Sequence, residues 1–303
     1  MTVNRSTAGA ATATSCGVKH CSTEIEGIDI FYREAGPADA PVVLLPHGYP
    51  SSSFQFRNLM PALADRWRLM APDFPGFGYS GTPDRADFSY TFDGYADFLG
   101  WFATAMNLTR YALYLHDYGS QIGLRLAMKR PEQVAALIIQ NGDIYEDELG
   151  PKYDALKAYW ANPTPEGRAK LANAVSEVGF RDEFLNDVSA HLVERISPDL
   201  WKLAWPLMRQ AERREIMIGL MEGLRENLDW FARYQAYLRE HQPPTLIVWG
   251  PQDGYMPEGS ARAYLRDLPN AELHLLDGGH WALETNLDEI VALARDFLGR
   301  VHH

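Results

Sequence analysis

The stretch Tyr111–Gly123, which reads YALYLHDYGSQIG, decides the fold of the chain. Its first five residues are apolar or aromatic and predict a buried strand. From Gly119 onward, apolar side chains recur at helical spacing as far as Pro131. A strand, an abrupt turn and a helix in immediate succession are typical of a nucleophile elbow, which usually carries a serine. Here the central position is Asp117.

An aspartate at the tip of this turn predicts a different chemistry from that of a serine. Its carboxylate is already charged at pH 7, and the positive end of the following helix stabilises that charge. Such a group attacks an electrophilic sp3 carbon and leaves an ester on the enzyme. The competing interpretation is that Asp117 only caps the helix that begins near Gly119. The rest of the chain favours the catalytic interpretation.

Composition narrows the class of protein. The 303 residues are enough for one large α/β domain with an insertion, or for two domains. The net charge of −12 argues against a surface that binds nucleic acid or an anionic membrane. No apolar run is long enough for a transmembrane helix. Cys16 and Cys21 are too few for a disulfide framework or a zinc site. We expect a cytoplasmic enzyme without a metal or another cofactor.

Strands that alternate with helices predict a mainly parallel, doubly wound α/β sheet. The predicted strands are two short ones within 22–33 and six further ones at 41–45, 67–72, 111–115, 134–140, 245–249 and 272–276. The predicted helices are at about 54–64, capped from 51–53, and at about 92–106, 119–130, 257–268 and 283–300.

The alternation stops between Asp143 and Glu240, where the sequence shows helical patterns only. Because this block lies between two strands of one sheet, we interpret it as a helical cap over the strand ends. Residues Met1–Ser15 lack the apolar core of a secretory signal. The predicted domains are a flexible leader over 1–21, an α/β core formed by 22–142 and 241–303, and a helical cap over 143–240.

Two further loops carry the partners that a nucleophilic aspartate needs. The strand that ends at Trp249 is followed by GPQDG, which contains Asp253. The strand that ends at Leu276 is followed by DGGHW, which contains His280. Catalytic groups collect where the carboxyl ends of parallel strands meet. The order nucleophile, acid and histidine on three such loops therefore predicts a catalytic triad.

From about residue 24 to residue 298 the sequence resembles the α/β-hydrolase superfamily. The segments HGYP, DFPGFGYS, HDYGS and GGHW are similar to those of the branch that contains epoxide hydrolases and haloalkane dehalogenases. The resemblance implies Asp117 as the nucleophile, His280 as the base that activates water, and Asp253 as the acid that orients this base. The ester formed on Asp117 would be hydrolysed in a second step.

The resemblance also implies an oxyanion hole, formed by the backbone N–H groups of Tyr118 and Tyr49. These donors would stabilise the negative charge that develops on the ester oxygen. His47, Gly48 and Pro50 complete the HGYP motif. We expect His47 to support the turn at Gly48 and Tyr49, and not to take part in the chemistry.

The same residues bear on the choice between an epoxide and a halide. Some dehalogenases carry the acid after the strand that follows the elbow helix, a position occupied here by Asn141, so the acid is Asp253. Dehalogenases typically bind the halide through a Trp next to the nucleophile and a motif Asn or a second Trp. This chain has Tyr118 and Tyr49 at those motif positions, which counts against dehalogenation. The cap residue Trp160 remains available as an indole donor.

Epoxide hydrolases place two cap tyrosines over the ring oxygen, but no cap tyrosine of this chain aligns cleanly with them. We expect Tyr159 or Trp160, together with Tyr234, to supply donors, and Trp281 to contact the substrate. Packing is the competing interpretation for each of these aromatic residues.

The leading hypothesis is hydrolysis of a small hydrophobic epoxide by water to a vicinal diol. The first alternative is dehalogenation of a haloalkane or haloacid, and a non-catalytic small-molecule receptor on the same scaffold is the second. We expect no nucleic-acid or membrane partner. The sequence leaves the oligomeric state open, with a homodimer as one option.

Overall fold

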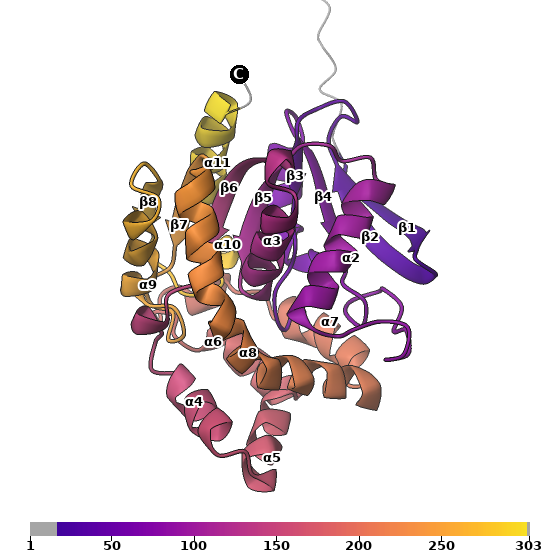
Figure 1. Cartoon of the computed structure of the whole chain (residues 1–303), viewed down its shortest axis with the longest axis vertical. Helices are drawn as coiled ribbons and strands as arrows, with labels where there is room; N and C mark the ends of the chain where they lie inside the picture. Colours follow the sequence, from indigo (N-terminus) through magenta and orange to yellow (C-terminus); the bar gives the residue numbers. More distant parts are fainter. Residues whose placement is uncertain (1–16, 302–303) are drawn as a thin grey trace, which may run out of the picture.

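A computed structural model describes residues 17–301 of the chain. One eight-stranded sheet runs through its centre, with the strand order β1-β2-β4-β3-β5-β6-β7-β8 (Figure 1). Strand β2 pairs antiparallel with β1 and β4, and all other neighbours pair in parallel. The strands are β1 (Lys19–Ile25), β2 (Ile28–Ala35), β3 (Val42–Leu44), β4 (Arg68–Pro72), β5 (Tyr111–His116), β6 (Val134–Gln140), β7 (Thr245–Trp249) and β8 (Glu272–Leu275). The predicted mostly parallel α/β sheet is confirmed.

The sheet divides the core into two layers, and the side chains of the central strand β5 point alternately into one and the other. Tyr111, Leu113 and Leu115 belong to one buried cluster, and Ala112 and Tyr114 belong to the other, because successive side chains point to opposite faces of a sheet. Helices α2, α3, α8 and α9 contribute to the first cluster, and α1 and α11 to the second. The core helices are α1 (Leu59–Leu63), α2 (Phe92–Ala105), α3 (Tyr118–Lys129), α9 (Glu258–Ala263), α10 (Ala282–Thr285) and α11 (Leu287–Val301).

Between β6 and β7 the chain forms helices and connecting loops. Helices α4 and α5 lie farthest from the sheet, and α8 turns back from this group to run along the sheet face (Figure 1). These helices are α4 (Tyr153–Ala161), α5 (Pro165–Ala174), α6 (Glu177–Leu185), α7 (Asp199–Met208) and α8 (Ala211–His241). Within residues 17–301, no helix is both long and apolar enough to cross a bilayer.

Several boundaries differ from the sequence-based expectations. Lys19–Cys21, assigned to the leader, begin β1 because they pair with the antiparallel strand β2. Most of the expected leader, including Cys16, lies outside the described residues. The helix expected over 54–64 is divided into a 3-10 turn, capped by Ser52, and α1. The expected C-terminal helix is likewise divided at Asn286, where α10 ends before α11 begins.

Candidate active site

The turn between β5 and α3 holds Asp117 in an unusual backbone conformation. Its φ of 51° and ψ of −133° are rare for a residue with a side chain, and such strain is concentrated at functional sites. The side chain makes no capping hydrogen bond to α3. The structure therefore contradicts the interpretation that the Asp117 side chain caps α3. Its carboxylate instead contacts Tyr49 and His280.

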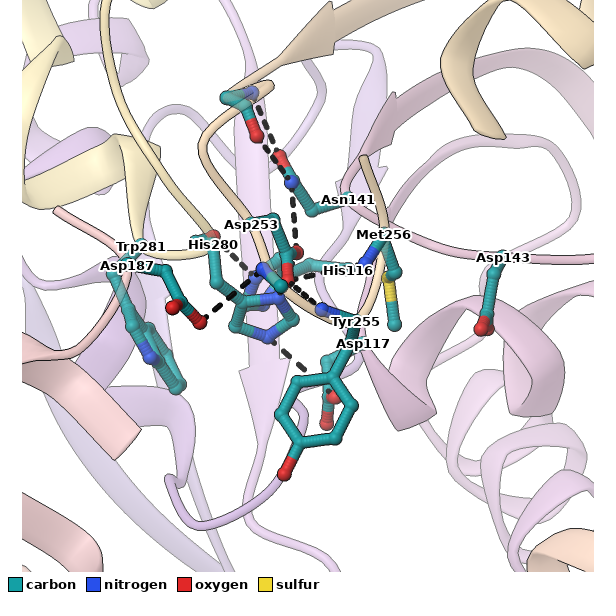
Figure 2. Close-up of polar contacts among 12 residues, drawn as sticks. His116, Asp117, Asn141, Asp143, Asp187, Asp253, Tyr255, Met256, His280 and Trp281 are labelled. Carbon is teal, nitrogen blue, oxygen red and sulfur yellow. Dashed lines mark hydrogen bonds and ion pairs between the residues drawn. The ribbon is translucent and has the colours of Figure 1, made fainter. Parts of the chain in front are cut away.

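The Asp117 carboxylate contacts a different group through each of its oxygens. Oδ1 accepts a hydrogen bond from the backbone N–H of Tyr49 at 2.5 Å. Oδ2 lies 3.5 Å from Nε2 of His280 (Figure 2). A Cβ atom at position 48 would lie only 2.5 Å from the Asp117 Cβ, so the close approach of the two loops requires Gly48. The side chain of Asp117 is thus held between two loops.

His280 is oriented by a carboxylate that is itself held by several donors. Its Nδ1 lies 2.7 Å from Oδ2 of Asp253, and the same oxygen accepts a hydrogen bond from the Asn141 side chain at 2.9 Å. The other oxygen accepts from the backbone N–H groups of Tyr255 and Met256 (Figure 2). Among the described residues, Nε2 of His280 has no hydrogen-bond partner, so this nitrogen is available on the side that faces Asp117.

The residue before the nucleophile also fixes His280. His116 Nε2 lies 3.0 Å from the backbone carbonyl of His280, and its Nδ1 lies 3.3 Å from the side-chain amide of Gln55. Burial and the nearby charge of His280 lower the pKa of His116 to about 3. A neutral His116 therefore donates from Nε2 to the His280 carbonyl, which also accepts from Gln140 at 3.1 Å.

Charges within the site determine the protonation of these groups. Burial alone would lower the pKa of His280, but Asp253 and Asp117 outweigh burial and raise this pKa well above its usual value. Burial alone would raise the pKa values of Asp117 and Asp253, but His280 outweighs it and lowers both. The resting site therefore favours two carboxylates around a histidine that holds its proton strongly.

The HGYP segment forms one wall of the site. His47 is buried, and its Nε2 accepts a hydrogen bond from the backbone N–H of Phe74 at 3.0 Å. Its Nδ1 consequently donates to the Gly48 carbonyl at 3.1 Å. The next peptide bond, Tyr49–Pro50, is cis. His47 thus joins two loops through contacts with the backbone of Gly48 and Phe74.

A cavity of about 550 Å³ opens over the nucleophile, within the size range of small-molecule sites. Asp117, Tyr118 and Tyr49 line it on the side of the sheet, and residues of α4, α5, α6, α8, their connecting loops and the loop after β7 line the remainder. Most of this lining is apolar. The apolar side chains are Ala155, Leu156, Ala158, Leu171, Ala174, Met221, Leu224 and Met256. A small, largely hydrophobic molecule therefore fits beside Asp117.

Two aromatic residues predicted to supply donors lie on α4. Tyr159 lines the cavity, but its hydroxyl donates to Glu222 at 2.7 Å. Trp160 does not line the cavity, and its indole N–H donates to the Met221 carbonyl at 3.3 Å. The polar hydrogens of both residues are therefore committed to other protein groups.

Tyr234 and Trp281, the other two predicted contacts, lie outside the cavity lining. Tyr234 is fully buried, and its hydroxyl lies 3.1 Å from the side-chain oxygen of Asn227. The structure thus corrects the expectation that Tyr234 supplies a donor to the substrate. The indole N–H of Trp281 donates to the Glu183 carbonyl at 3.1 Å. Trp281 therefore contacts the backbone of α6, and the structure corrects the expectation that it contacts the substrate.

Three further side chains that line the cavity with Asp117 are not among the substrate contacts expected from the sequence. Tyr153 lies at the start of α4, Glu183 lies on α6, and Tyr255 follows the acid Asp253 by two positions. The position of Tyr255 could have been inferred from its place on the same loop as Asp253. Within residues 17–301, no cluster of His, Cys, Asp and Glu side chains is arranged to hold a metal ion.

Comparison with known proteins identifies the family. Residues 41–287 match the family model described as alpha/beta hydrolase fold. The chain belongs to the α/β-hydrolase family. This result confirms the predicted superfamily and indicates that the protein is a hydrolase.

Relatives of this α/β-hydrolase have several activities. The chain is 32% identical to an uncharacterized hydrolase of Saccharomyces cerevisiae, over 90% of this chain and 93% of the relative. It is 28% identical to a cis-3-alkyl-4-alkyloxetan-2-one decarboxylase of Shewanella oneidensis, over 90% and 86%. It is 29% identical to a haloalkane dehalogenase of Sphingobium indicum, over 92% and 94%. The last of these relatives belongs to the predicted branch.

A solved epoxide hydrolase, CorEH, has a similar fold. It superposes with a TM-score of 0.76 at 20% sequence identity, over 94% of this chain and 100% of the other. At this identity the likeness concerns the fold alone.

Proposed function

We propose that this α/β-hydrolase opens an epoxide with water to give a vicinal diol, through an ester on Asp117. The observation that carries the proposal is the position of Asp117. It lines a mostly apolar cavity, with one oxygen on the Tyr49 amide and the other facing His280. An ionised carboxylate attacks an sp3 carbon without a base to activate it.

The two oxygens of Asp117 have different roles in this mechanism. Oδ2 attacks the carbon, and the C–O bond of the ring breaks toward the ring oxygen. Oδ1 stays on the Tyr49 N–H and becomes the ester carbonyl, so the donor for the later oxyanion is already in place. His280 then takes a proton from water, whose oxygen attacks this carbonyl carbon. The tetrahedral intermediate breaks its bond between the carbonyl carbon and Oδ2, and the leaving alkoxide takes the proton from His280 and departs as the diol.

Formation of the ester changes the basicity of His280 in the required direction. The negative charge of Asp117 is one of the groups that raise the pKa of His280 in the resting site. The ester is neutral, so this contribution is lost when the ester forms. The pKa of His280 consequently falls, and the proton that His280 releases balances the one taken up by the ring oxygen. A neutral histidine is then available to take a proton from water in the second step. Asp253 remains to orient the ring.

A hydrogen-bond donor must stabilise the negative charge that grows on the ring oxygen as the C–O bond breaks. Tyr49 presents such a group, because this residue lines the cavity and its buried hydroxyl has no hydrogen-bond partner among the described residues. Tyr153 and Tyr255 line the same cavity. Burial raises the pKa of Tyr49 well above its usual value, so the phenol keeps its proton. These phenols replace the donors predicted from Tyr159, Trp160 and Tyr234.

Replacement of Tyr49 by Phe tests this donor. We expect the rate of ester formation to fall by about a hundredfold, the effect of losing one donor to a developing oxyanion. The backbone N–H that holds Asp117 is retained, so the second step should be preserved. Tyr95→Phe is the matched control, since the buried Tyr95 hydroxyl donates to the Pro75 carbonyl outside the cavity. Equal pre-steady-state rates for Tyr49→Phe and wild type would exclude Tyr49 as the donor.

Dehalogenation is the alternative that the same nucleophile permits. It is less well supported because the candidate indoles are occupied: Trp160 donates to Met221 and Trp281 donates to Glu183. The phenols in the cavity suit an oxygen that becomes an alkoxide. We would measure turnover on styrene-type epoxides and 1-haloalkanes in parallel, and read diol and halide together. Diol without halide supports the proposal, and halide without diol overturns it.

A further inference from the structure

Helix α6 presents a carboxyl group to the cavity. Gly179 and Glu183 are four residues apart and both line the cavity, because this spacing places residues on one helix face. The adjacent face is anchored in the core: Phe180 packs against Tyr49, with ring centroids 5.9 Å apart, and Phe184 packs against Trp281 at 4.3 Å. The orientation of Glu183 is therefore set by buried packing on both sides.

A second contact fixes Glu183 itself. The indole N–H of Trp281 donates to the Glu183 backbone carbonyl at 3.1 Å, and Trp281 directly follows His280 (Figure 2). The backbone of α6 is thus joined to the loop that carries the candidate base. The contact between Trp281 and the Glu183 backbone therefore helps to hold Glu183 in the cavity that Asp117 also lines.

The carboxyl group of Glu183 has no protein partner. Among residues 17–301 it makes no hydrogen bond and no ion pair. Lys152 also lines the cavity, but its ammonium group pairs with Asp187 at 2.5 Å. Glu183 is partly buried, and a carboxyl group in such a place without a protein partner gains from a hydrogen bond that a ligand supplies. A group carried by the substrate can provide the hydrogen bond that the protein leaves unmade.

We propose that Glu183 selects, among epoxides, those that bear a hydroxyl group near the ring, by accepting a hydrogen bond from that hydroxyl. This inference rests on the proposed epoxide hydrolysis and names its substrate class. The apolar lining of α4, α5 and α8 takes the alkyl part of the molecule. Asp117 attacks the ring carbon, and Glu183 binds the hydroxyl.

The preference should depend on pH in a defined direction. Burial raises the pKa of Glu183 to about 7, although His280 and Lys152 oppose the shift, while the charges of Asp117 and Asp253 add to it. A carboxylate accepts a stronger hydrogen bond from a hydroxyl than a protonated carboxyl group does. The preference should therefore be largest above pH 7 and should decrease as pH falls through this value.

The test compares 2,3-epoxyhexan-1-ol with 2,3-epoxyhexane. For each enzyme we would measure the ratio of their kcat/KM values from about pH 5.5 to about pH 8.5. Other groups of the site affect the hydrolysis of both epoxides, so their contributions largely cancel in the ratio. This holds for the ionisation of His280, Asp117, Asp253 and Lys152 and for hydrogen-bond donation by the tyrosines. The difference in intrinsic reactivity between the two epoxides changes the ratio by the same factor at every pH. For wild type, the ratio should rise about tenfold or more through a pKa near 7.

Variants on the same helix separate recognition from structure. In Glu183→Leu the ratio should fall at least about tenfold at high pH and lose its pH dependence. Glu183→Gln keeps an acceptor without a charge, so its ratio should be intermediate and independent of pH. Glu177→Gln is the matched control, because Glu177 lies on α6 outside the cavity and pairs with Lys202. This variant should show the wild-type ratio and pH dependence.

The outcomes distinguish this inference from the proposed function. If neither epoxide is hydrolysed, the proposed function fails. If both are hydrolysed with a ratio that is insensitive to pH and to Glu183→Leu, only the inference fails, and Glu183 is simply hydrated in the cavity. A ratio that titrates in wild type and is flat in both Glu183 variants supports the inference.

Discussion

Asp117→Asn should reduce turnover by at least about 10^4-fold while the protein stays folded. A neutral amide cannot attack an sp3 carbon, so no ester can form. The fold should be retained because the amide oxygen can still accept the hydrogen bond from the Tyr49 N–H. The measurement is steady-state hydrolysis of an epoxide that the wild type accepts, with the variant confirmed by intact mass.

The matched control is Asp97→Asn, which makes the same chemical change on α2 at an exposed ion pair with Lys129. This control should keep wild-type turnover. Substantial activity in Asp117→Asn, with its mass confirmed, would remove Asp117 from the role of nucleophile and end the two-step account.

His280→Gln should form the ester but fail to hydrolyse it. Asp117 attacks without a base, whereas water in the second step needs one, so turnover should fall by about 10^4-fold, the upper end for general base catalysis. Asp253 keeps its hydrogen bonds from Asn141, Tyr255 and Met256, so the loop should stay in place. Intact-mass spectrometry should then show an accumulated adduct.

The mass of the adduct also identifies the kind of substrate. Ring opening of an epoxide expels no atoms, so the protein gains the full mass of the epoxide. A haloalkane loses its halide and adds only the alkyl part. The double variant Asp117→Asn with His280→Gln is the control and should show no adduct. Unmodified His280→Gln protein, with a substrate that the wild type turns over, would contradict either the base assignment or the covalent step.

Local sequence patterns were sufficient for the sheet and for the side chains that meet at its edge. The strand, turn and helix around Asp117 leave a short-range signal, since the apolar run and the helical repeat are adjacent in the chain. The loops of Asp253 and His280 follow the buried strands β7 and β8. The parallel order of the sheet then brings the three side chains together.

The lining of the cavity could not be predicted in this way. Glu183 faces the cavity because Phe180 and Phe184 pack on residues from distant parts of the chain, and the pattern of α6 alone does not select that face. Tyr234 illustrates the opposite error. It packs on α3, where Arg125 lies 6.0 Å from its ring and bonds to the same Asn227 side chain at 2.9 Å. Only the tertiary contacts of α8 decide this orientation.

The source of the product oxygen tests the central claim, attack by Asp117 itself, most directly. In a single turnover with excess enzyme in H2(18)O, we expect the first diol to be mostly unlabelled, because Asp117 gives its own Oδ2 to the carbon. Water then attacks the ester carbonyl, so the peptide that contains Asp117 should gain the label, which mass spectrometry of the digested protein detects. Direct attack by water would instead give a labelled diol and an unlabelled Asp117 peptide, and that result would contradict the account.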